Sequence, residues 1–142
     1  MPTLNTAITA SASALRAERV RIETAVSNIA NAETTRGADG KPYRRRDVVL
    51  TPEAVNTFDD VLGAASAIGV KVAGVVEDQT PFRQRYEPSH PDADANGFVS
   101  VPNVEVPDEM VDMLGAARAY QANLTAIGLI RDTIQKALEL AK

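Results

Sequence analysis

The sequence predicts an α+β protein, mainly helical, in which long N- and C-terminal helices pair with each other around a small, mostly antiparallel β module. Apolar residues recur at heptad spacing near both ends, and no Gly or Pro lies between Thr3 and Arg36. Seven of the eight prolines fall between residues 33 and 107. We therefore divide the chain into an N-terminal core helix (1–32), a β-rich module with loops (33–107) and a C-terminal core helix (108–142), the two helices forming one axial domain.

The first helix is expected from about Leu4 to Ala32, with Thr3 as its N-cap. Gly37 follows and favours an end to the helix. Polar residues interrupt the second column of its heptad pattern, but the first column is regular. The residues of this first column are Ile8, Leu15, Ile22 and Ile29.

The second helix is expected from Asp108, as its N-cap after Pro107, toward Leu140. Its apolar spacing alternates between three and four residues and is the strongest periodic signal in the chain. A parallel column of small residues, Gly115, Ala119, Ala122 and Ala126, would allow another helix to approach closely. The apolar stripe itself consists of Met110, Met113, Ala117, Tyr120, Leu124, Ile127, Ile134, Leu138 and Ala141.

Between the helices, β-rich runs predict strands at Val48–Leu50 and Val70–Val76, with weaker candidates at Arg83–Tyr86 and Phe98–Val101. Phe58–Ala67 is compatible with a short helix. The segment 51–68 carries no recognisable motif, so its structure and role are left open.

Composition argues against several function classes. The 142 residues fit one domain or one compact domain plus an extension. A net charge of −4 is unlike that of a nucleic-acid binder. No run approaches the ~20 apolar residues that span a bilayer, so no membrane insertion is expected. No cleavable secretory signal is visible at the N-terminus. The absence of Cys removes disulfides and thiolate chemistry.

Motifs for catalysis, cofactors or metals are weak. The run Asp92–Gly97 matches the opening of a calcium loop, but Asn103 stands where a bidentate Glu is needed, so a polar turn is the better interpretation. His90 is the only histidine and lies in a loop beside Pro91. We expect no catalytic residue, no metal site, no cofactor and no small-molecule substrate.

Arg44, Arg45 and Arg46 form the one basic cluster. Two interpretations remain open for it: contact with an acidic neighbouring subunit or an anionic surface, or a charged strand edge that prevents unwanted pairing.

The helix lengths favour an assembly. Helices of about 29 and 33 residues span roughly 43 and 50 Å, whereas a compact 75-residue module is only about 30 Å across. Long striped helices that project from a small module are typical of a subunit of a larger helical assembly. A monomeric helical hairpin is the alternative.

Several motifs, in this order and over nearly the whole chain, resemble the rod and hook proteins that form the axial family of the bacterial flagellum. The segment 27–32 is the signature of the broad family, and the later motifs are most similar to short proximal rod proteins. The matching segments are Ser27–Ala32, Gly40–Arg45, Tyr86–Pro88, Asp92–Asp94, Gly97–Val99, Pro102–Val104, Glu109–Val111 and Ala117–Asn123.

The resemblance implies a non-catalytic structural subunit of the basal-body rod. Such proteins are exported by the flagellar type III apparatus without signal cleavage, stack helically in the periplasm with other rod subunits and copies of themselves, and line the channel of a torque-transmitting rod with their terminal helices. Heptad or motif residues expected at this assembly interface are Ile8, Leu15, Ile22, Ser27, Asn28, Ile29, Asn31, Asn103, Met110, Met113, Ala117, Tyr120, Gln121, Ala122, Asn123, Leu124, Ile127, Ile134 and Leu138.

Two alternatives are kept. The chain could be another rod- or hook-type axial subunit, which its short length and C-terminal motif disfavour. It could also be a soluble coiled-coil adaptor or secretion chaperone, which should not need a proline-rich β module between its helices.

Overall fold

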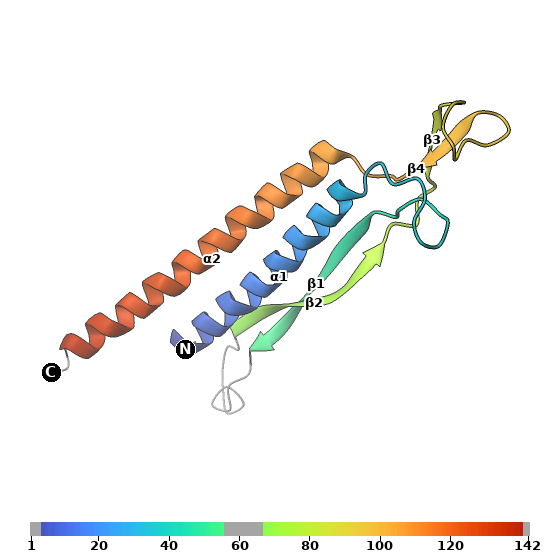
Figure 1. Ribbon diagram of the computed structural model, residues 1–142. Coiled ribbons are helices and arrows are strands. Elements are labelled where there is room, and N and C mark those ends of the chain that lie inside the picture. Colours follow the sequence, from blue (N-terminus) through green and yellow to red (C-terminus); the bar gives the residue numbers. More distant parts are fainter. Residues whose placement is uncertain (1–3, 56–66, 141–142) are drawn as a thin grey trace.

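The computed structural model describes residues 4–55 and 67–140 and confirms the predicted α+β class. Its elements are α1 (Leu4–Ala30), β1 (Arg46–Val55), β2 (Ala67–Glu77), β3 (Arg83–Tyr86), β4 (Phe98–Val101) and α2 (Val106–Leu140). α1 contacts α2 on one side and both strands of the β1–β2 hairpin on the other. Figure 1 shows the resulting three layers, with β3 and β4 at the end farthest from the chain termini.

The two helices run antiparallel and begin or end close to their expected limits (Figure 1). α1 ends two residues before the expected Ala32, and the proposed cap Thr3 lies outside the described residues. The expectation of Asp108 as N-cap is wrong: α2 starts at Val106, and the Glu109 N–H already donates to the Glu105 carbonyl oxygen at 3.1 Å. Pro107 therefore stands in the first turn, where a helix needs no N–H from it.

The β module is two separate two-stranded antiparallel sheets, β1–β2 and β3–β4, and not one compact unit. β3 and β4 match their predicted ranges, whereas β1 and β2 extend beyond theirs. The helix predicted for Phe58–Ala67 falls almost wholly outside the described residues, and Ala67 itself begins β2. The longer hairpin runs back along α1, so α1 has much more cover within the chain than its heptads suggested.

Pro52 and Ser13 help to set how the β1–β2 hairpin packs against α1. Pro52 pairs with Val70 and has no N–H to donate. Proline is tolerated at this position because the backbone nitrogen lies on the edge of β1 that faces away from β2. On the other side of that pair, the Val70 N–H donates to Ser13 Oγ of α1 at 3.0 Å. A register shift between Val49 and Leu50 then bends the hairpin.

α1 is the central layer, and its most buried positions are small or polar. Thr6, Ser13, Ala17, Ala25 and Asn28 are buried. The predicted column of Ile8, Leu15, Ile22 and Ile29 is half-buried throughout. Small side chains at the buried positions let a helix and a hairpin approach α1 together.

The predicted stripe of α2 is half right. The buried and half-buried side chains with alternating spacing of four and three are Glu109, Met113, Ala116, Tyr120, Asn123, Ile127, Ile130 and Ile134. We call this row the α2 seam. Four expected residues, Met113, Tyr120, Ile127 and Ile134, lie on it, but Met110, Ala117, Leu124 and Leu138 are exposed one column away. The ninth, Ala141, lies outside the described residues. The column that contains Ala116 is the one that faces α1, and Ala116 is fully buried there.

Gly115 and Ala122, from the expected small column, are exposed, whereas Ala119 and Ala126 border the seam and are half-buried. Neither helix in the described part of the chain is long and apolar enough to cross a membrane.

Substitution of adjacent alanines tests this register. Ala116 is 0% exposed, so Ala116→Leu should lower the free energy of unfolding by about 1–3 kcal/mol through overpacking. Ala117→Leu is the matched control and should change it by less than about 0.5 kcal/mol, because Ala117 faces outward. Urea unfolding followed by circular dichroism measures both, and a larger loss at Ala117 would contradict the register.

Candidate functional site

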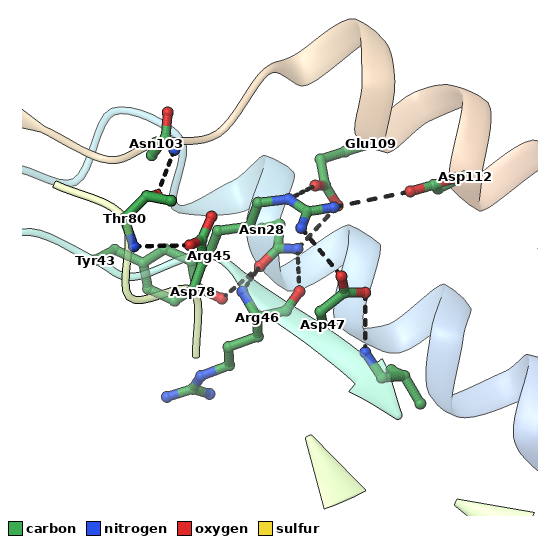
Figure 2. A network of polar contacts seen from close by, with 11 residues as sticks. Asn28, Tyr43, Arg45, Arg46, Asp47, Asp78, Thr80, Asn103, Glu109 and Asp112 are labelled. Carbon is green, nitrogen blue, oxygen red and sulfur yellow. Dashed lines mark hydrogen bonds and ion pairs between the residues drawn. The ribbon is translucent and has the colours of Figure 1, made fainter. Parts of the chain in front are cut away.

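The end of α1, the segment before β1 and the start of α2 meet at a buried side-chain amide, that of Asn28, which is 1% exposed. Its Nδ2 donates to the Arg46 carbonyl oxygen at 2.8 Å and to Glu109 Oε2 at 2.9 Å. Its Oδ1 accepts from the Arg46 N–H and from the Tyr43 hydroxyl, both at 2.9 Å. The amide thus makes all four hydrogen bonds of which it is capable. We call this arrangement the helix junction (Figure 2).

The two bonds with Arg46 explain why an amide is needed. The Arg46 N–H and carbonyl are the pair of groups that a neighbouring strand would engage in a β-ladder. One side-chain amide supplies one donor and one acceptor in place of that strand, which a carboxylate cannot do. Asn28 therefore closes the edge of β1 at its first residue.

Glu109 carries the junction onto α2. Its side chain is 3% exposed, and Oε1 accepts from Arg45 Nε at 2.6 Å. Arg45 also lies 3.3 Å from an Asp47 carboxylate oxygen and 3.9 Å from one of Asp112. Burial lowers the pKa of Arg45, but the hydrogen bond and charge of Glu109, with a smaller contribution from Asp47, outweigh it and hold that pKa above its ordinary value.

The basic cluster has internal partners, which neither of the two open interpretations had foreseen. Arg44 donates to the Asp78 carbonyl oxygen at 2.8 Å and stacks over Phe82 at 4.5 Å. Arg46 lies 3.7 Å from a Glu77 carboxylate oxygen. Each of the three arginines therefore joins the start of β1 to another segment.

Polar contacts connect the end of the molecule that carries β3 and β4 to the segments around the junction. Asn103 Nδ2 donates to Thr80 Oγ1 at 2.7 Å (Figure 2). The Thr80 N–H donates to Asp78 Oδ1 at 2.8 Å, and this bond lowers the pKa of the Asp78 carboxyl. Arg85 of β3 bonds Glu33 at 2.8 Å.

The expected interface residues divide between several places. Asn28 and Ser27 lie in the junction, with Ser27 Oγ 3.2 Å from the Tyr43 hydroxyl. Asn31 Nδ2 donates to the Ser27 carbonyl at the end of α1, at 2.9 Å. Asn123 lies on the α2 seam, whereas Gln121 is exposed.

Sequence reasoning missed the pairing of Arg45 with Glu109, although both residues lie in motifs that it recognised. No local signal joins them, because 64 positions of chain separate them.

In the loop that resembles a calcium site, the Asp and His side chains already accept hydrogen bonds from other groups of the chain. Asp94 Oδ1 accepts from the N–H groups of Asn96 and Phe98, both at 2.8 Å. Asp92 accepts from Thr35, and His90 Nδ1 accepts from the Asp92 N–H. Within residues 4–55 and 67–140, no group of three His, Asp or Glu side chains is placed to hold a metal ion.

A second feature is the outward side of α2. Large apolar side chains there are exposed, at 50% for Met110, 54% for Leu114, 55% for Leu124 and 63% for Leu138. Together with Ala117, they follow one another at intervals of four, three, seven and fourteen residues and form what we call the α2 flank. An apolar row of this length on a single chain is typical of a protein interface.

Comparisons with known proteins point to one family. Residues 95–140 match a family described as flagellar basal body rod FlgEFG protein C-terminal, and they cover the whole α2 seam. The flagellar basal-body rod protein FlgC of Salmonella typhimurium is 44% identical over 130 residues, 92% of each chain. That of Bacillus subtilis is 42% identical over 93% of this chain and 94% of its own, and that of Borreliella burgdorferi is 37% identical over 96% and 97%.

These similarities place the chain among the structural subunits of the flagellar basal-body rod. Identities of this size over nearly the full length of the relatives narrow the assignment. The chain belongs to the FlgC family of flagellar basal-body rod proteins.

Replacing the junction amide tests its role. Asn28→Asp puts an acceptor against the Arg46 carbonyl and the Glu109 carboxylate, so the free energy of unfolding at pH 7 should fall by about 2–4 kcal/mol. Asn5→Asp, on the exposed side of α1, is the control and should change it by less than about 0.5 kcal/mol. Urea unfolding decides, and equal values for the two variants would contradict the role of the amide.

Proposed function

We propose that this chain polymerises into the proximal part of the rod through the α2 flank. The observation that carries the proposal is the exposure of that flank on a helix whose other side is already packed. Burial of exposed Met and Leu side chains against neighbouring subunits would drive association. The neighbours are copies of this chain and other rod subunits, and no catalytic step is involved.

The helix junction suits a part that carries torque. Asn28, Arg45 and Glu109 connect α1, β1 and α2 through side chains, so a load on one helix is shared with the other two segments. A buried and fully bonded polar network resists the slippage along a helix that purely apolar contacts permit. The junction would therefore hold each subunit as one rigid body.

The place of action follows from the family. The relatives are named as basal-body rod proteins, which supports a position in the rod. We extend this to the periplasm and to delivery by the flagellar type III export apparatus without signal cleavage. The terminal helices would line the channel of the rod.

A charge on the α2 flank separates assembly from folding. Leu124 is 55% exposed, so Leu124→Asp should change the free energy of unfolding by less than about 0.5 kcal/mol. In the rod the same carboxylate would be buried without a partner, so the variant should be absent from isolated basal bodies and the cells should not swim.

The matched control is Ser89→Asp, in an exposed loop beyond β3, which should be incorporated as the wild type is. Wild-type recovery of Leu124→Asp in basal bodies would remove the α2 flank from the interface.

A further inference from the structure

An open groove runs between α1 and β2, on the side of α1 away from α2. The groove consists of two cavities of about 520 and 270 Å³, and Val20 lines both of them. On α1 they extend from Ser13 to Ser27, which is roughly 20 Å of helix. We call this the α1–β2 groove.

The lining of the groove is mixed. Its apolar residues are Ala17 and Val20 of α1 and Val70, Val72 and Val75 of β2, and polar or charged side chains, among them Arg16, Glu23 and Lys71, line the rest. Val75 lines the cavity opposite α1 and is nevertheless 47% exposed. The bend at the register shift between β1 and β2 accounts for the gap, because it leads this end of the hairpin away from α1.

The occupant that fits best is a helix with a row of large apolar side chains. In the described part of the chain, the α2 flank is such a row without a partner: Met110, Leu114, Ala117 and Leu124 recur every three, four or seven residues and are exposed. The flank cannot reach the groove of its own chain, because α1 lies between them (Figure 1).

Charges along the two elements are complementary. Lys71 and Glu77 of β2 stand six residues apart beside the groove, a separation of about 20 Å. Each lies 3.7 Å from a partner in its own chain, Glu53 and Arg46 respectively, but both side chains remain at least half exposed and can face a second charge. Arg118 and Asp132 of α2 are fourteen residues apart, about 21 Å. A helix that runs antiparallel to α1 would bring Arg118 to Glu77 and Asp132 to Lys71, with Leu124 near the middle of the groove.

We propose that the α2 flank of one copy lies in the α1–β2 groove of the next copy. This inference rests on the proposed self-assembly and specifies its geometry. The two surfaces differ, so the contact is head-to-tail: it leaves one groove and one flank free at the ends and can continue as an open helical array.

The absence of Cys from the chain makes disulfide crosslinking a clean test. Val75→Cys with Leu124→Cys in one chain should give dimers and higher multimers when isolated basal bodies are oxidised and run without reductant. Ala73→Cys with Leu124→Cys is the matched control and should stay monomeric, because Ala73 does not line the groove.

Incorporation without a Val75–Leu124 crosslink would overturn the groove assignment and leave the proposed function intact. Absence of the wild-type chain from the rods would overturn both.

Charge reversal covers the case in which the cysteine variants are not incorporated. Lys71→Glu and Asp132→Lys should each lower recovery in basal bodies at least about fivefold, and the double variant should restore it to within about twofold. Failure of the double variant to exceed either single variant would contradict the groove.

Discussion

The whole fold depends on one saturated side-chain amide at the point where three segments meet. Asn28 substitutes for a missing strand at the start of β1 and bonds Glu109 at the start of α2. An unsatisfied buried donor or acceptor costs about 1–3 kcal/mol. Any shift of α2 along α1, or of the hairpin across them, would leave such groups unpaired. The junction therefore sets the register of all three layers.

The two helices differ in how many of their sides are packed within the chain. α1 lies in the middle, with small residues such as Ala17 and Ala25 that let a helix and a hairpin pack on it together. α2 packs on one side only and keeps Met110 and Leu124 exposed. Under the proposed assembly, stability within the chain and association between chains would use different faces, which would allow a subunit to fold before it is incorporated.

How much of this could be predicted from the sequence differs between elements. Heptad spacing and the clustering of prolines were enough for the two helices. The weaker strand candidates matched β3 and β4, whereas the β-rich runs located β1 and β2 but not their full lengths. The seam of α2 was displaced by one column because its apolar residues cover more than one face. Only the partner helix selects Ala116 over Ala117, and no spacing rule contains that information.

The contacts between the buried polar groups could not be predicted from the sequence, for a related reason. In the sequence, Glu109 stands near the start of the second helix, where a negative charge is favourable in any case, and Arg45 belongs to the basic cluster. Their pairing depends on the hairpin returning along α1, a long-range feature that local patterns do not report. The motifs that identified the family contain both residues, so the resemblance marked the junction without explaining it.

The central claim is that the junction acts as one unit, and a double-mutant cycle on Arg45 and Glu109 tests it most directly. Arg45→Met leaves a buried carboxylate unpaired, whereas Arg45→Met with Glu109→Gln removes both charges and keeps an acceptor for Asn28. The two single losses of stability should together exceed the double loss by about 1–3 kcal/mol. Additivity within about 0.5 kcal/mol would contradict the account.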